Sequence, residues 1–385
     1  MLEKALKGSG GYWTWIIILL GFMAAGAISY IQQYNYGLGY TGMSRDVSWG
    51  IYIAQFTFLV GVAAGGVMVV LPYYIHDYKT FGRITILGEF LAIAAVAMCL
   101  MFIIADLGQP LRALNVLLHP SPNSMLFWDM IVLNGYLFLN VIVGWVVLSA
   151  EQKGAPPPKW YKPFAYLSIP WAISIHTVTA MLYCGLPGRH FWLTAILAPR
   201  FLASAFAAGP ALLLFIALIL KKVTAFDIGE KAQSKLVTII TYALILNFFF
   251  LSLEFFVGYY SNIPGHMHTL DYLFWGLHGH DNLVPFMRFS IFLGVLAFIL
   301  LFIPKTRTND TMLGIACLCV FFSLWIDKGF GFVLGGFVPN MLEQITEYVP
   351  TVGEIFITLA VWATGFLILT ILFKIAIDVK LESES

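Results

Sequence analysis

The sequence predicts an all-α integral membrane protein that crosses the bilayer with about ten helices. Of its 385 residues, 60% are hydrophobic and only 11% are charged, and the mean hydropathy is +0.86. Soluble domains carry about 25% charged residues. A chain this apolar is expected to turn hydrophobic side chains toward lipid. We therefore expect one continuous polytopic membrane domain over residues 1–385 rather than several globular domains.

Ten stretches are long enough to span a membrane. A hydrocarbon core about 30 Å thick requires about 20 mostly apolar residues in a helix. The run 239–250 is continuously apolar and lacks the alternation that membrane β-strands show. Pro, Gly and Asn gather in the connections, as helix breakers should. The predicted helices cover residues 13–31, 49–75, 83–107, 126–150, 164–187, 201–221, 236–260, 284–304, 312–334 and 353–379.

The distribution of Lys and Arg predicts the orientation. When the connections are assigned to alternate sides, fifteen of the 21 Lys and Arg residues fall on the side of the termini. Short cytoplasmic loops are enriched in these residues, so both termini are predicted to be cytoplasmic, in the cytoplasmic membrane. The opposite side has longer loops, rich in His and Trp, that either dock a partner or simply cap the bundle. These loops cover residues 32–48, 108–125, 188–200, 261–283 and 335–352, and Arg200 is counted among them.

Ionisable residues within the spans mark the positions most informative about function. Glu89, Asp106, Asp129, His176 and Glu254 all fall inside predicted helices. Such groups are costly in a membrane and usually face an interior cavity or one another. His176 stands near the middle of its helix, on a face that also carries hydroxyl residues, so we expect that face to point inward.

Other polar residues have structural explanations as well as functional ones. Asp106 and Arg112 stand at one helix end and either form a structural clamp or serve proton transfer. Asp327 and Lys328 are adjacent, which favours a local ion pair or separate capping charges. Trp49 at a helix end is typical of the interfacial aromatic belt, and a ligand contact is the alternative.

The sequence gives no indication of a resident redox centre. Among eight histidines only His176 lies well within a span, and a membrane haem usually takes facing His ligands. The four cysteines occur in apolar stretches without a C-x-x-C pair, which favours hydrophobic packing over a metal or iron–sulfur site. Electrons would therefore come from a partner or from a diffusible organic carrier.

Small residues in the second predicted helix suggest such a carrier. The segment 61–66, Gly-Val-Ala-Ala-Gly-Gly, permits close helix approach. A slot between tightly packed helices suits a flat quinone head group. Quinone reduction also moves two protons, for which Tyr, Gln, His and carboxyl side chains are suitable partners.

Several motifs together resemble the NrfD/PsrC family of membrane subunits. The run 48–65 resembles the first core helix of that family, and Asp106-Leu-Gly-Gln-Pro-Leu-Arg112 resembles its turn after the second core helix. Phe127-Trp-Asp129, Ser174-Ile-His-Thr177 and Gly185-Leu-Pro-Gly-Arg189 fit the branch with ten helices. The resemblance covers essentially the whole chain and rests on the order and spacing of the motifs.

The beginning of the chain is most similar to the DsrP branch of the family. Residues 1–7 and 42–46 carry this similarity. That branch belongs to the DsrMKJOP complex, so the resemblance implies a role in dissimilatory sulfite or sulfate metabolism. It implies an eight-helix core of two four-helix bundles, with one added helix at each end. It also implies menaquinone as bound carrier, with no haem or iron–sulfur cluster in this chain.

The resemblance further implies the partners and the site. The partners would be an extracytoplasmic ferredoxin-like iron–sulfur subunit, a multihaem cytochrome c, a membrane cytochrome b and a cytoplasmic iron–sulfur catalytic subunit. We predict three groups of residues. The quinone-binding group is Trp49, Tyr52, Gln55, Asp129, His176 and Thr177; the proton path is Glu89, Asp106, Arg112 and Glu254; the partner-docking group is Arg189, His190, His266 and His268.

The leading hypothesis is thus a menaquinone-reactive subunit of a respiratory complex, active only with its partners, with proton translocation considered as an additional activity. A proton-coupled secondary transporter is the first alternative. It would use Glu89, His176 and Glu254 as a relay and predicts broken helices in two related halves, which the sequence does not show. The second alternative is a membrane anchor for redox partners that has no quinone chemistry.

Overall fold

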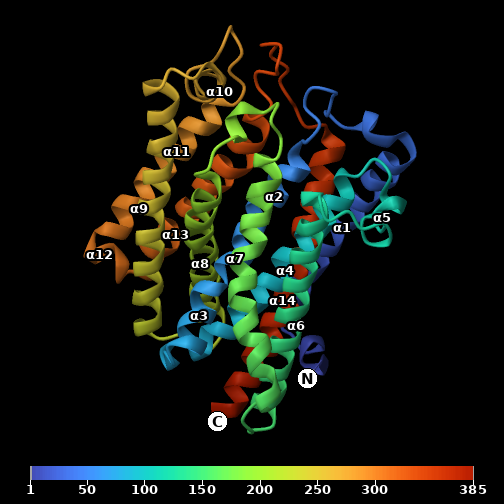
Figure 1. Ribbon diagram of the computed structural model, residues 1–385. Helices are drawn as coiled ribbons and strands as arrows, with labels where there is room; N and C mark the ends of the chain where they lie inside the picture. The colour runs from blue at the N-terminus through green and yellow to red at the C-terminus, as the bar shows by residue number, and fades with distance from the viewer. Residues whose placement is uncertain (1, 385) are drawn as a thin grey trace.

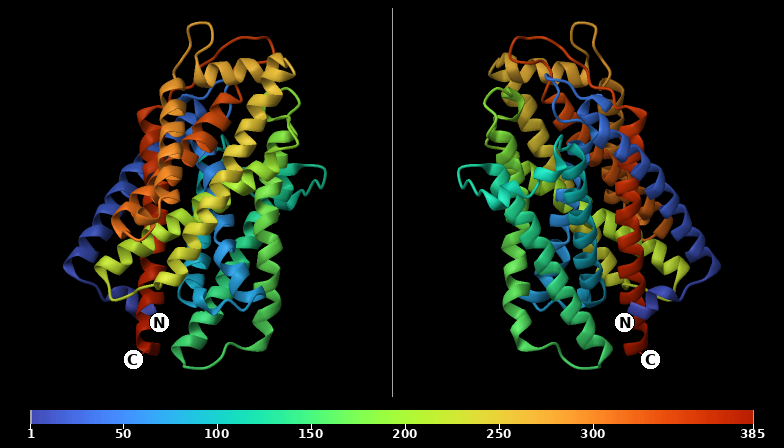
Figure 2. Two further views of the ribbon diagram at one scale, coloured as in Figure 1. Left: turned by 90° about the vertical axis from the view of Figure 1, so that its left-hand side faces the viewer. Right: turned by 90° about the vertical axis from the view of Figure 1, so that its right-hand side faces the viewer.

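The computed structural model describes residues 2–384 and consists of long helices that run along a common direction (Figure 1). Ten of the helical segments are long and apolar enough to cross a membrane, and the described residues contain no strand, so the predicted fold class is confirmed. Both termini lie at one end of the bundle (Figures 1 and 2). We refer to the opposite end, formed by α10 and the loops 185–196 and 335–351, as the distal end.

Most spans agree with the predicted stretches to within a few residues, some extending beyond them and others, such as α7 and α11, ending two or three residues earlier. Short helices α5 (Asn115–Leu118), α10 (Pro264–Phe274) and α12 (Pro304–Arg307) lie in the connections. The spans are α1 (Gly10–Tyr36), α2 (Ile51–Gly65) continued by α3 (Val67–Ile75), α4 (Gly82–Asp106), α6 (Met125–Gln152), α7 (Lys162–Cys184), α8 (Leu197–Val223), α9 (Glu230–Tyr260), α11 (Val284–Phe302), α13 (Asp310–Trp325) continued by the π-helix η7 (Ile326–Leu334), and α14 (Val352–Glu384).

The inner eight spans form two groups of four. In the first bundle, α2 and α3 pack with α4, α6 and α7; in the second bundle, α8 and α9 pack with α11 and with α13 and η7. The helix α2 joins the two bundles through contacts with α8 and η7, and 94% of the apolar window of its span is buried. The side chains on α2 and its neighbours are therefore shielded from lipid.

Glycines set the close approach of α2 to α8. A Cβ atom on Gly65 would lie 2.6 Å from the Cα atom of Gly209 and 2.6 Å from the carbonyl oxygen of Ala205. Neither position can hold a larger residue without moving the helices apart. Small residues commonly permit this kind of crossing in membranes.

The first and last spans lie outside the two bundles. α1 packs mainly on α14, and only 17% of its apolar window is buried. A Cβ atom on Gly26 would lie 2.1 Å from the Cβ atom of Ala360, so these two helices are also in close contact. Figure 2 shows α1 inclined along the side of the bundle, next to α14.

Candidate functional site

Three charged residues from the second bundle meet in the protein interior. The guanidinium of Arg200 on α8 donates from Nη2 to both carboxylate oxygens of Asp327 on η7, at 3.0 Å each. Its Nη1 donates to Glu254 on α9. Each side chain is at most 10% exposed. Buried charges persist when they are paired and hydrogen-bonded, as they are here.

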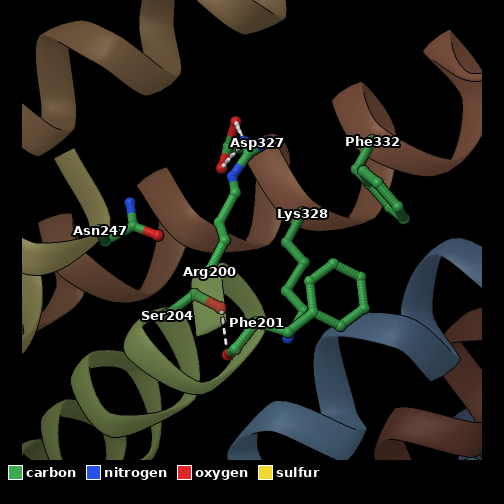
Figure 3. Close-up of a pocket in the computed structure, with 7 residues that line it drawn as sticks. All are labelled: Arg200, Phe201, Ser204, Asn247, Asp327, Lys328 and Phe332. Carbon is green, nitrogen blue, oxygen red and sulfur yellow. Dashed lines mark hydrogen bonds and ion pairs between the residues drawn. The ribbon is translucent and has the colours of Figure 1, made fainter. Parts of the chain in front are cut away.

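Lys328 follows Asp327 in the sequence but points in another direction (Figure 3). Its Nζ lies 2.5 Å from Nε2 of His176 on α7 and 4.1 Å from the centroid of the Phe201 ring. Among the ion pairs of residues 2–384, none joins Lys328 to Asp327, so the predicted local ion pair is wrong. We call Arg200, Glu254, Asp327 and Lys328 the charge cluster.

Neighbouring residues on a helix point in different directions, so Asp327 and Lys328, which lie in the π-helix, reach different bundles. The α-helix α13 widens into η7 at Ile326, and the next two residues direct their side chains to Arg200 and His176. Segments of π-helix are rare and occur often at functional sites. The prediction that Arg200 belongs to a distal loop is also wrong, because α8 begins at Leu197 and Arg200 is 5% exposed.

Two narrow crevices meet beside Lys328, and neither has room for a water molecule. One is lined by charge-cluster residues together with Phe201, Ser204, Asn247 and Phe332 (Figure 3). The other extends past Gly61, Ala205 and Leu324. Ser204 and Lys328 line both. The buried Oδ1 of Asn247 has no hydrogen-bond partner, so the first crevice contains an acceptor that can still bind a donor.

A row of polar side chains follows the inward face of α7 from His176 toward the distal end. His176, Thr179 and Tyr183 are all fully buried and, at spacings of three and four residues, lie one above another. The hydroxyl of Thr179 donates to Oδ1 of Asp129 on α6 at 2.8 Å. The hydroxyl of Tyr183 is hydrogen-bonded to that of Thr57 on α2. We call His176, Thr179 and Tyr183, with their partners Asp129 and Thr57, the α7 ladder.

Aromatic rings cover the distal end of the α7 ladder. Trp49 contacts Tyr183 edge-on at 5.4 Å between ring centroids and stacks on Trp192 at 5.7 Å. The indole of Trp192 donates to the carbonyl of Phe332 at 2.9 Å. The structure thus brings three of the predicted quinone-binding residues, Trp49, Asp129 and His176, to one side of α2.

The other three residues of that group point elsewhere. The hydroxyl of Tyr52 donates to Gln33 on α1 at 2.6 Å. The amide oxygen of Gln55 accepts from the indoles of Trp325 at 2.8 Å and Trp362 at 3.0 Å, on the side of α13 and α14. Thr177 donates to the carbonyl of Ile173 in its own helix.

The residues of the predicted proton path are separated. Glu89 lies toward the end with the termini, where it accepts from the hydroxyl of Tyr74 at 3.2 Å. Asp106 has an oxygen without a hydrogen-bond partner, and no ion pair of the described residues joins it to the exposed Arg112. Glu254 is bound to Arg200, within the charge cluster. No continuous chain of hydrogen bonds in residues 2–384 connects these four positions.

All four predicted docking residues lie at the distal end, and three of them are histidines. A Cβ atom on Gly265 would lie 2.7 Å from the Cβ of His190, so α10 rests on the 188–192 loop. Burial, and then the neighbouring His190, lower the pKa of His266. Nδ1 of His268 lies 2.8 Å from a carboxylate oxygen of Glu343.

The fourth, Arg189, holds distal loops together. It donates to the carbonyl of Phe337 at 3.1 Å and to that of Asp46 at 3.0 Å. Burial lowers its pKa, and the nearby Asp46 opposes that effect. This side chain is occupied within the chain, whereas the histidines remain at the surface. Across residues 2–384, no three His, Cys, Asp or Glu side chains gather as a metal ion would require.

Comparison with known proteins places this arrangement in a family. Residues 39–330 match the family described as Polysulphide reductase, NrfD. The matched range begins after α1 and ends within η7, so it contains the two bundles and omits α14. Both the charge cluster and the α7 ladder therefore fall within it.

Three relatives are similar over more than half of the chain. A "Putative dimethyl sulfoxide reductase membrane subunit" of Halobacterium salinarum is 29% identical over 57% of this chain and 54% of its own length. A selenate reductase subunit of Mesobacillus selenatarsenatis is 25% identical over 67% of this chain and 68% of its own. The Hdr-like menaquinol oxidoreductase integral membrane subunit of Archaeoglobus fulgidus is 25% identical over 65% and 62%. The chain thus spans little more than half of the halobacterial relative.

Proposed function

The chain belongs to the NrfD, or polysulphide reductase, family, and we propose that it is the quinone-reactive membrane subunit of a multi-subunit respiratory oxidoreductase. Each of the three relatives is named as one subunit of a reductase or oxidoreductase. The observation that carries the proposal is the α7 ladder, a row of buried proton-exchanging groups that leads from the interior to the distal end.

Menaquinol is the proposed substrate. One relative is named as a menaquinol oxidoreductase subunit. Oxidation of a quinol releases two protons and two electrons, so its site requires hydrogen-bond acceptors and a route for protons. His176 and Asp129 supply these: Nδ1 of His176 is buried without a partner, and Asp129 lies one helical turn further along the ladder, bound to Thr179. The aromatic rings of Trp49 and Trp192 would have to move aside for a head group to enter.

The proposed reaction also requires electron-transfer partners. The electrons of the quinol would pass to another subunit of the complex, in keeping with the names of the relatives, each a subunit of a reductase or oxidoreductase. We propose an extracytoplasmic iron–sulfur subunit that docks on the distal histidines and transfers electrons to or from a multihaem cytochrome c. A membrane cytochrome b and a cytoplasmic iron–sulfur catalytic subunit would complete a complex for sulfur metabolism. This assignment also places the termini in the cytoplasm, supported by the excess of Lys and Arg at their end.

Substitutions on the ladder test the proposal in the assembled complex. His176→Gln and Asp129→Asn remove proton exchange while keeping similar size, and menaquinol-dependent reduction of the partner's iron–sulfur centres should fall by about 10²-fold or more. Ser168→Ala is the matched control, because Ser168 is a buried residue of α7 that bonds only the carbonyl of Ala165. Unchanged rates in both ladder variants would reject the assignment.

A further inference from the structure

We propose that Lys328 carries a proton between the charge cluster and His176, and so connects the second bundle to the α7 ladder. The source of the proton rests on the proposed function, whereas the connection itself rests on geometry alone. Lys328 is the residue of the charge cluster that touches the ladder, at 2.5 Å from Nζ to Nε2 of His176.

The contact accommodates only one extra proton. Nε2 of His176 lies 2.5 Å from the Lys328 ammonium nitrogen and 2.7 Å from the carbonyl oxygen of Phe201. If both side chains were cationic, each would present an N–H to the other at this short distance. A protonated Lys328 can donate to a neutral imidazole, and a protonated His176 can donate to a neutral amine. At most one of the two side chains is therefore cationic: Nε2 accepts from a protonated Lys328, or it carries an N–H of its own that can donate to Phe201.

The rest of the charge cluster holds that proton close to Lys328. Arg200 and Lys328 supply two positive charges, and Glu254 and Asp327 supply two negative charges, in a region where every side chain is at most 10% exposed. Loss of the Lys328 proton would leave the cluster with an uncompensated buried charge, which is costly. A transfer to His176 avoids this cost, because the charge moves over one hydrogen bond and remains near the carboxylates.

Lys328 lines both crevices, and its flexible side chain carries three N–H donors. The unpartnered Oδ1 of Asn247 lines the same crevice on the side of Arg200, away from Phe201 (Figure 3). Gly61, whose Cβ would lie 3.1 Å from Nζ, keeps the space beside the contact open.

The transfer is balanced in protons and charge. One N–H bond on Lys328 breaks as one N–H bond on His176 forms, and no electrons move. Nδ1 of His176 has no hydrogen-bond partner, so onward transfer to Asp129, which is bound to Thr179 one turn further along the ladder, requires a bridging group such as water or the quinone. Running in reverse, the same step returns a proton released on the ladder to Lys328.

Arginine separates proton transfer from a purely electrostatic role. Arg keeps the positive charge but does not release its proton in proteins, whereas Gln removes both. In the reconstituted complex, Lys328→Arg and Lys328→Gln should both lower the menaquinol-dependent rate by tenfold or more. Lys374→Gln, which breaks an ion pair with Asp378 inside α14, serves as control. A wild-type rate in Lys328→Arg, or in Lys328→Gln, would overturn the proposal.

A spectroscopic measurement distinguishes this proposal from the function it extends. In complex labelled with ¹⁵N-histidine, with His176→Gln used to assign the resonances, Nε2 of His176 should show a shift between those of protonated and unprotonated nitrogen. In Lys328→Gln, the chemical shift of Nε2 should move to the value expected for a nitrogen whose N–H donates to the carbonyl of Phe201. Unchanged resonances, in a complex that still oxidises menaquinol, would reject the role of Lys328 alone. If the wild-type complex did not oxidise quinol, the proposed function would be rejected instead. The shared proton would then be judged from the ¹⁵N chemical shifts alone.

Discussion

Lys328 and His176 lie 152 positions apart in the sequence, yet Nζ of one is 2.5 Å from Nε2 of the other. The contact joins the π-helix of the second bundle to the middle of α7 in the first bundle. It connects two buried systems, the charge cluster and the α7 ladder. Helix packing and paired charges keep these two systems in place.

The ion pairs of Arg200 should be important for stability. Arg200→Leu would leave Glu254 and Asp327 buried without their cation, and breaking a buried pair typically costs about 3–5 kcal/mol. We expect a loss of that size in the free energy of unfolding, measured by denaturing-detergent titration. Arg45→Gln, which changes an exposed loop residue, should have little effect. Equal stability of the two variants would show that the cluster tolerates unpaired carboxylates.

The crossing of α2 and α8 should not accept a side chain at Gly65. In Gly65→Val the new atoms meet the backbone of Gly209, which cannot move without displacing α8. Overpacking of this kind costs about 1–3 kcal/mol, and the displacement should also lengthen the contact between Lys328 and His176. Thermal unfolding of the purified chain would measure the loss. Gly21→Val is the control, because no atom lies within 4 Å of a Cβ at that position; a similar loss there would point to helix propensity instead.

Acid should weaken the distal end through His266. Burial, and then His190, lower the pKa of His266, so the folded chain binds fewer protons at this position than the unfolded chain. The contribution to stability is therefore complete above the unfolded value of about 6.5 and is lost as the pH falls through the folded pKa. The melting temperature should fall between pH 7 and pH 5, and less so in His266→Gln. His119→Gln, an exposed histidine, should keep the wild-type dependence; an identical dependence in all three would remove His266 as the cause.

Much of the fold follows from the sequence, because span length and hydropathy are local properties. The ten spans are predicted from apolar stretches of sufficient length, and the glycines of 61–66 indicate the close helix approach. His176 and Asp129 are predicted to be functional because an ionisable group within a span is costly. Their common position on the α7 ladder depends on Thr179, whose role only the fold reveals.

The directions of side chains could not be predicted in the same way. Gln55 is one helical turn from Tyr52, but two indoles from α13 and α14 fix its amide on the far side of α2. Asp327 and Lys328 suggest a local pair, but neighbouring residues on a helix do not face each other, and their partners are Arg200 and His176. In the sequence, Arg200 stands at the end of a loop-like segment. In the structure it is buried, because it forms ion pairs with Glu254 and Asp327. These outcomes depend on distant partners rather than on local pattern.

Photoaffinity labelling with a menaquinone analogue tests the central claim most directly. The purified complex would be irradiated with a ring-azido menaquinone, and the labelled peptides would be identified by mass spectrometry. We predict label on α7 between His176 and Cys184 or on α6 around Asp129, removed by excess menaquinol. Label confined to α1 and α14, the helices that Tyr52 and Gln55 face, would contradict the assignment of the quinone site to the α7 ladder.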